Sequence, residues 1–189
     1  MSSQAAKRRR TDYEASSSVQ NESTGNLTSA KSVRELAEPY RVCTAKFPID
    51  ALTPSWSQGI NRPVSNKHVL TLYRTFEGEG LQREANNNHL IVGCTAEQIR
   101  KMRFHFDLLG KPSRWPESTS GPWPSFHEWT AVTKEKAETI SGQHRVEALK
   151  MFLAQNSKRL GLSENDERWW ICDIYDLGKH AADRVILVY

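Results

Sequence analysis

The segment from Thr139 to Leu149 holds the residues best suited to bind an anion. A short apolar stretch is followed by Ser141 and Gly142, and a helical pattern that carries His144 and Arg145 begins directly after the glycine. A chain that turns at a glycine and starts a helix at once leaves backbone N–H groups unpaired, and the helix dipole adds positive potential there. Backbone donors and an Arg side chain suit the tetrahedral oxygens of a phosphate. The alternative is an ordinary strand-to-helix connection with a solvated Arg.

The elements before this turn follow from the spacing of apolar residues. Tyr40 to Ile49 predicts a first strand, and Ser65-Asn66 caps a predicted helix that ends near Gly78. His89 to Cys94 predicts a short buried strand. A second helix is expected from Thr95, because Gln98 three residues later completes a capping box.

The elements around and after the turn are a loop, a strand, a helix and a last strand. Residues 110–127 form a long loop rich in Pro and Trp, whose Trp side chains serve either to stack on a ligand base or to anchor the loop, and we favour the anchor. A strand is expected at Trp129 to Thr133, and a third helix is expected to end before Gly161. Apolar and polar residues alternate from Trp169 to Tyr175, which predicts a last strand. The fold class is therefore α+β, a small mixed sheet packed with helices.

Composition excludes several classes of protein. The net charge of +4 is too small to indicate nucleic-acid binding by itself, and no apolar run reaches the length of a membrane span. Cys43, Cys94 and Cys172 lie far apart and outside any CxxC spacing, which favours neither a disulfide framework nor a zinc site. The sequence shows no group of acidic residues with metal-ligand spacing, so we expect no bound metal other than one brought by a ligand.

Residues 1–38 differ in composition from the rest of the chain. They are rich in Ser and other polar residues, so we expect a disordered tail before a domain at 39–189. The apolar end at 185–189 suggests that the domain is truncated there. The tail carries one basic cluster, formed by Lys7, Arg8, Arg9 and Arg10. This cluster predicts nuclear import, and therefore a nuclear or nucleocytoplasmic protein. The alternative is that it only makes the tail more soluble.

The order of the elements, together with Gly142-Gln143-His144-Arg145 between a strand and a helix, resembles the ParB/sulfiredoxin-like superfamily. Sulfiredoxin has Gly-Cys-His-Arg at this point and ParB has Gly-Glu-Arg-Arg. The similarity covers roughly 48–178, with 85–128 expanded. The resemblance implies that this turn holds nucleotide phosphates, with ATP or CTP and Mg²⁺ as the ligand.

An upstream segment, Pro54-Ser55-Trp56 and Asn61-Arg62-Pro63, is similar to the box before the family's first helix. A Lys near this point assists phosphate binding in sulfiredoxin, so the resemblance implies that either Lys67 or His68 binds phosphate here. The alternative is that Lys67 is only a solvated residue. Arg62 offers a planar fork to a second phosphate. The predicted nucleotide site is Ser141, Gly142, Gln143, His144, Arg145, Arg62, Lys67 and His68.

Gln143 separates this chain from both relatives in chemistry. Sulfiredoxin needs the thiol that Gln143 replaces, and the loss of the ParB Glu removes a possible base for CTP hydrolysis. The sequence identifies no catalytic residue, although phosphoryl transfer or triphosphate hydrolysis would be the reaction class of such a site. The alternative function is a non-catalytic nuclear interaction or nucleic-acid-associated protein that keeps the fold and binds a protein or single-stranded partner.

Overall fold

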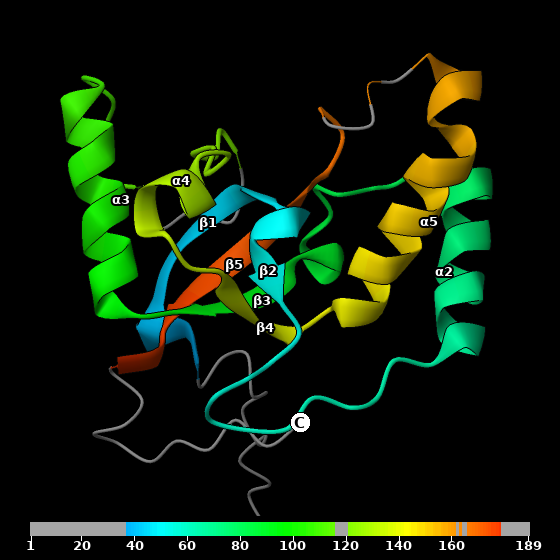
Figure 1. The fold of residues 1–189 in the computed structure, drawn as a ribbon, viewed down its shortest axis with the longest axis horizontal. Helices are drawn as coiled ribbons and strands as arrows, with labels where there is room; N and C mark the ends of the chain where they lie inside the picture. The colour runs from blue at the N-terminus through cyan, green and yellow to red at the C-terminus, as the bar shows by residue number, and fades with distance from the viewer. Residues whose placement is uncertain (1–36, 116–120, 162, 164–165, 179–189) are drawn as a thin grey trace, which may run out of the picture. The chain divides into compact units, whose positions relative to one another are not determined.

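The computed structural model describes residues 37–115, 121–161, 163 and 166–178. These residues form an α+β domain, as predicted from the sequence (Figure 1). Its mixed five-stranded sheet has the order β1-β5-β3-β4-β2, in which β5 and β3 are parallel, β4 and β2 are parallel, and the other neighbours are antiparallel. The strands are β1 (Arg41–Pro48), β2 (Leu52–Thr53), β3 (Leu90–Cys94), β4 (Ala137–Ser141) and β5 (Trp169–Asp176). The basic cluster at 7–10 and the apolar end at 185–189 lie outside the described residues, so the predictions made for them stay predictions.

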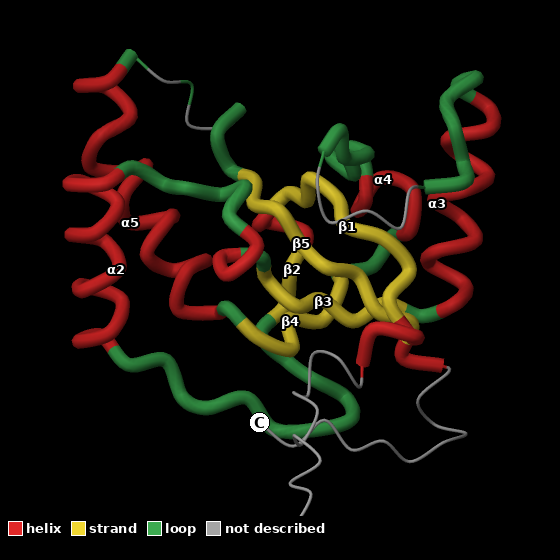
Figure 2. Tube along the Cα trace, turned by 180° about the vertical axis from the view of Figure 1, so that it is seen from behind, coloured by secondary structure: helices red, strands yellow, loops and turns green. Residues whose placement is uncertain are grey.

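Two groups of helices flank the sheet. Figures 1 and 2 show α2 and α5 side by side at one end of the sheet, with α3 and α4 at the other. The helices are α2 (Asn66–Glu79), α3 (Ala96–Leu108), α4 (Trp129–Thr133) and α5 (Gln143–Leu160), and three short 3₁₀ turns are η1 (Glu38–Tyr40), η2 (Ile49–Ala51) and η3 (Asn86–Asn88). The capping box predicted for α3 is present, since Gln98 N–H donates to Thr95 Oγ1 at 3.2 Å and the Gln98 side chain accepts from the Thr95 N–H at 3.0 Å.

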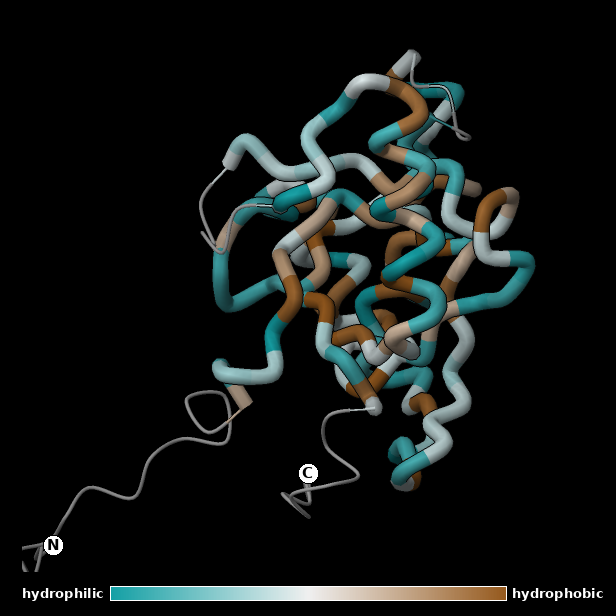
Figure 3. Tube along the Cα trace, turned by 90° about the vertical axis from the view of Figure 1, so that its left-hand side faces the viewer, coloured by the Kyte–Doolittle hydropathy of each residue, from teal (hydrophilic) through white to brown (hydrophobic). Residues whose placement is uncertain are grey.

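The main core lies on one face of the sheet. Alternate residues of the three strands β1, β5 and β3 point to this face, and apolar residues of α2, α3 and α5 pack in the same cluster. Figure 3 shows the hydrophobic stretches gathered in the interior of the domain. The strand residues of this face are Cys43, Ala45, Phe47, Leu90, Val92, Cys94, Trp170, Cys172 and Ile174. The opposite face of β5 is buried as well, because a second cluster of Ala37, Tyr40, Trp56, Ile91 and Tyr175 packs there. The predicted alternation of apolar and polar residues therefore does not appear as alternating burial.

The strand predicted at Trp129 to Thr133 is wrong, because these residues form the short helix α4. Trp129 and Thr133 are both buried, and a separation of four residues places them on one helical face. The Thr133 hydroxyl donates to the Trp129 carbonyl oxygen at 2.9 Å, and Lys134, with φ of 65°, ends the helix in the left-handed region. Strand-forming residue types concealed a helical spacing over a segment too short for periodicity to decide.

The loop predicted at 110–127 is tied to the core and to the edge strand β1. Trp115 is buried against Phe106 and Phe126, which confirms the expectation that it anchors the loop. The Lys46 N–H donates to the Pro124 carbonyl oxygen at 2.9 Å, and the Phe126 N–H donates to the Lys46 carbonyl oxygen at 2.8 Å. The described part of the loop therefore satisfies backbone groups that an edge strand would otherwise expose.

Candidate functional site

The turn between β4 and α5 requires a glycine. Gly142 has φ of 103° and ψ of 9°, a conformation that residues with a side chain rarely adopt. A Cβ at this position would lie 2.3 Å from Leu90 Cδ2, so the turn also packs closely against β3. The glycine thus fixes both where α5 begins and how near its first turn lies to the sheet.

The start of α5 offers backbone donors to a ligand. Among the described residues no side chain caps this helix. The first N–H groups that bond within the helix are those of Arg145 and Val146, which reach the Gly142 carbonyl oxygen at 2.9 and 3.2 Å. The N–H groups of Gln143 and His144 precede these bonds and therefore point out of the helix start, where the dipole is positive.

A second helix begins beside the first. Figure 1 shows α2 and α5 running in the same direction, with both N-termini at the same end. Ser65 is the N-cap residue of α2, but its hydroxyl makes no capping hydrogen bond within the described part of the chain. The Ser65 N–H instead donates to His144 Nε2 at 3.0 Å. Two helix dipoles therefore direct their positive ends to one place, and His144 joins them.

A pocket of about 500 Å³ opens at these two helix starts. Three segments line it: the loop before α2, the first turn of α2, and the turn into α5. Its lining holds the Arg62 guanidinium and the imidazoles of His68 and His144, and none of the described residues in its lining is acidic. The full lining is Trp56, Ile60, Asn61, Arg62, Pro63, Ser65, His68, Ile140, Ser141, Gly142, Gln143 and His144.

Hydrogen bonds hold the loop before α2 against β4 and α5. The Asn61 amide donates to the carbonyl oxygens of Thr139, at 2.6 Å, and of Pro54. The Ser57 N–H and hydroxyl donate to the Glu138 carboxylate at 2.8 and 2.9 Å. On the other side of the pocket the Gln143 amide donates to the Arg62 carbonyl oxygen. The Arg62 backbone is thereby held beside the start of α5.

The two imidazoles of the pocket are in contact. The ring centroids of His68 and His144 are 4.8 Å apart, and the planes are nearly perpendicular at 84°. Burial, and to a smaller extent the neighbouring His68, lowers the pKa of His144 below its ordinary value. A lowered pKa favours the neutral ring, which agrees with the role of His144 as acceptor for the Ser65 N–H.

The structure brings together six of the eight residues predicted for the site. Of the two residues that the sequence left open, His68 is in the pocket lining and Lys67 is not. Arg145 is not in the lining, because its Nη2 donates to the Asn87 carbonyl oxygen at 3.2 Å and to Asn88 Oδ1 at 3.1 Å. Neighbouring residues of a helix differ in direction by about 100°, and the Arg145 side chain points to η3.

Sequence reasoning did not assign Trp56, Asn61 and Ser65 to the site. The available signal was Ser65-Asn66, which marked a second helix start. The family resemblance, and no local pattern, predicted that this start and the turn into α5 share a site. The pairing of the two helices is a long-range contact, and local patterns do not report such contacts.

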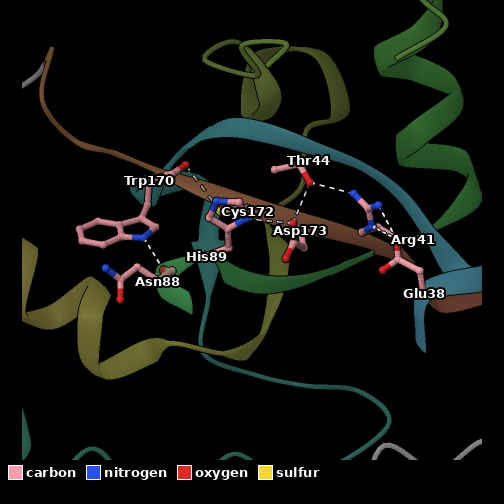
Figure 4. A network of polar contacts seen from close by, with 8 residues as sticks. All are labelled: Glu38, Arg41, Thr44, Asn88, His89, Trp170, Cys172 and Asp173. Carbon is pink, nitrogen blue, oxygen red and sulfur yellow. Dashed lines mark hydrogen bonds and ion pairs between the residues drawn. The ribbon is translucent and has the colours of Figure 1, made fainter. Parts of the chain in front are cut away.

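A second polar group lies on the face of the sheet opposite the main core (Figure 4). The Thr44 hydroxyl donates to Asp173 Oδ1 at 2.7 Å, and His89 Nδ1 lies 3.2 Å from the same oxygen. Arg41 donates to Thr44 Oγ1 at 3.0 Å and pairs with Glu38. These side chains join η1, β1, β5 and the residue before β3, so we assign the network to the stability of the sheet.

The described residues meet neither the requirements of a metal site nor those of a membrane-spanning helix. Among the described residues no three His, Cys, Asp or Glu side chains gather as a metal site would require. None of the helices in the described ranges is long and apolar enough to cross a bilayer.

Comparison with known proteins gives one finding. A family model described as "Protein of unknown function (DUF3723) N-terminal domain" matches residues 40–188, which include the whole sheet and every residue of the pocket. No curated protein and no solved structure matches the chain.

Proposed function

The chain belongs to the DUF3723 family through its N-terminal domain, and we propose its function from the pocket because the description of that family names no activity. The pocket binds the phosphates of a nucleotide between the starts of α2 and α5. One observation carries the proposal, namely that two helix N-termini without side-chain caps meet Arg62 in a pocket whose described lining has no carboxylate. Oriented N–H groups, two helix dipoles and a guanidinium together favour a multiply charged anion.

Each residue of the pocket has a distinct part in this proposal. The N–H groups of Gln143 and His144 bind phosphate oxygens at the turn that Ser141 and Gly142 shape, and the Arg62 guanidinium binds from the loop. The Ser65 hydroxyl and His68 bind from the start of α2. Two of the predicted residues lie outside the described lining. Arg145 fixes the position of η3 relative to α5 through its bonds to Asn87 and Asn88, and exposed Lys67 adds only positive potential.

The ParB/sulfiredoxin-like relationship stays a proposal. The strand-turn-helix setting of Gly142-Gln143-His144-Arg145 and the loop before α2 support it. ATP and CTP are accordingly the first ligands to try, and Mg²⁺ would enter with the phosphates. Sulfiredoxin chemistry is not proposed, because the three cysteines are buried and burial raises the pKa of Cys43 to about 12, so a thiolate at the turn has no source among them.

Binding, rather than turnover, is the activity we propose. Phosphoryl transfer or triphosphate hydrolysis needs a group that activates the nucleophile. The titratable side chains in the described lining that could accept a proton are His68 and His144, and His144 already accepts the Ser65 N–H. A hydrolytic activity would therefore have to involve these two imidazoles.

Isothermal titration of the full chain with ATP, CTP and GTP, each with and without Mg²⁺, tests the proposal. We expect binding of at least one nucleotide, and Arg62→Ala should weaken it about tenfold, since a charged hydrogen bond contributes about 1.5 kcal/mol. Arg74→Ala is the matched control, because Arg74 is exposed on α2 and outside the pocket lining. No binding of any nucleotide at millimolar concentration would refute the proposal.

The alternative function, an interaction protein, has one observation in its favour. A groove of about 410 Å³ between α3 and α4 is lined by Phe104, Leu108, Lys101 and their neighbours. Phe104 and Leu108 are 64% and 69% exposed, which is high for such large apolar side chains. Under this alternative Phe104→Ser would abolish partner binding and Arg62→Ala would leave it unchanged. Under the nucleotide proposal Arg62→Ala weakens nucleotide binding and Phe104→Ser leaves it unchanged.

Nuclear localisation also stays a proposal, and it rests on Lys7 to Arg10. A fluorescent fusion of the full chain should accumulate in the nucleus, and the same fusion without these four residues should not. Unchanged nuclear accumulation of the shortened fusion would contradict this part of the proposal.

A further inference from the structure

We infer that protonation of His144, whose ring contacts His68, switches the anion pocket on, so that a bound anion and a bound proton stabilise one another. The inference rests on the proposed function and concerns the regulation of the same site. It arises from the position of His144, which belongs to the start of α5 and at the same time occupies a backbone donor at the start of α2.

His144 and an anion would compete for one backbone donor. Its Nε2 lone pair accepts the Ser65 N–H at 3.0 Å, which is one of the donors that an anion at the start of α2 would use. A protonated imidazole has two N–H groups and no acceptor, so it cannot keep this bond. A single proton therefore releases the Ser65 N–H and also turns the His144 ring from an acceptor into a donor.

The surroundings of His144 oppose this protonation while the pocket is empty. His68 contacts the ring from α2, Arg62 lines the same pocket from the loop, and Lys67 is the next residue of α2 before His68. On α5 itself Arg145 is bonded to η3, and the carboxylate of Glu147 pairs with Lys150 at 2.7 Å. The Glu138 carboxylate of β4 accepts from the Ser57 N–H and hydroxyl, and the causes that act on the pKa of His144 are burial and His68. An anion in the pocket would add a negative charge beside this ring.

The direction of the pH dependence follows from these charges. Without an anion, burial and His68 keep the pKa of His144 below its ordinary value. A bound anion raises that pKa, and by linkage a lower pH then raises the affinity for the anion. Uptake of one proton changes the affinity by up to about tenfold per pH unit across the titration.

Isothermal titration of the full chain with inorganic sulfate tests the inference, because sulfate stays a dianion across the range and only the protein titrates. We expect sulfate to bind about tenfold more tightly at about pH 6 than at about pH 8. His144→Asn, which keeps an acceptor but cannot be protonated, should remove most of this difference. His127→Asn is the matched control, since His127 is 63% exposed and lies outside this pocket, and it should keep the whole difference.

The outcomes separate this inference from the proposed function. Sulfate binding that is equally strong at both pH values, or a pH difference that survives in His144→Asn, overturns the inference and leaves the nucleotide proposal standing. Failure of both sulfate and nucleotides to bind at either pH overturns both. If His144→Asn does not fold, His144→Gln replaces it and should remove the same pH difference. Nitrogen chemical shifts of the His144 ring provide a second measurement, which should show neutral imidazole with a bare Nε2 in the free protein and imidazolium with sulfate at about pH 6.

Discussion

At the scale of single residues, Gly142 decides where the pocket forms. Its left-handed conformation and its close approach to Leu90 both exclude a side chain, so the first turn of α5 can lie against β3 only with glycine here. The side chains of Gln143 and His144 bond to the backbone of Arg62 and Ser65, and in the proposed binding their own backbone N–H groups bind the phosphates.

Gly142→Ala should destabilise the protein by about 2 kcal/mol or more, because a strained backbone angle and a steric overlap are added together. Gly78→Ala is the control: no atom would lie within 4 Å of the added Cβ, and Gly78 is inside α2, so this change should stabilise by about 0.5–1 kcal/mol. Urea unfolding followed by circular dichroism measures both. Equal effects of the two substitutions would contradict the role assigned to Gly142.

At the scale of the elements, local signals predicted most of the fold. The capping box placed α3, apolar spacing placed α2 and α5, and runs of strand formers placed β1, β3 and β5. Sequence patterns failed at Trp129–Thr133, where a short helix shares its residue types with strands. They also gave no means to foresee that α2 and α5 begin side by side, although each start was predicted, because the pairing depends on the order of the strands.

The N-cap residues of α2 and α3 should respond differently to substitution. Thr95→Ala removes a capping box and should cost about 1 kcal/mol of stability. Ser65→Ala should cost almost nothing, because the Ser65 hydroxyl caps no backbone group, but it should weaken nucleotide binding. Thermal unfolding and nucleotide titration of the two variants check this contrast. A loss of stability in Ser65→Ala as large as in Thr95→Ala would show that its hydroxyl serves α2 and not a ligand.

At the scale of the whole molecule, the polar pocket and the three cysteines lie in separate parts of the domain. The pocket lies where two helices start at one end of the sheet, whereas Cys43, Cys94 and Cys172 are buried among the strands. Burial raises the pKa of all three thiols above their ordinary value, and for Cys43 to about 12. The domain therefore holds its cysteines as apolar packing groups.

Thiol reagents should accordingly detect none of the three cysteines at pH 7 in the native state and all of them in denaturant. The raised pKa of Cys43 also fixes the sign of a pH effect. Since the unfolded thiol ionises first, stability should fall as pH rises above about 9, by up to about 1.4 kcal/mol per unit for one thiol. Rapid labelling of a thiol in the folded protein, or stability that rises with pH in this range, would contradict this assignment.

Backbone amide chemical shifts of the full chain, recorded during a titration with ATP or CTP, test the binding of nucleotide phosphates between α2 and α5 most directly. We expect the largest shifts at the amides of Gln143, His144 and Ser65, which lie at the two helix starts. Amides of the α3–α4 groove around Phe104 should not change. Absence of shifts at both helix starts at millimolar nucleotide, or shifts confined to the groove, would contradict a phosphate site at this pocket.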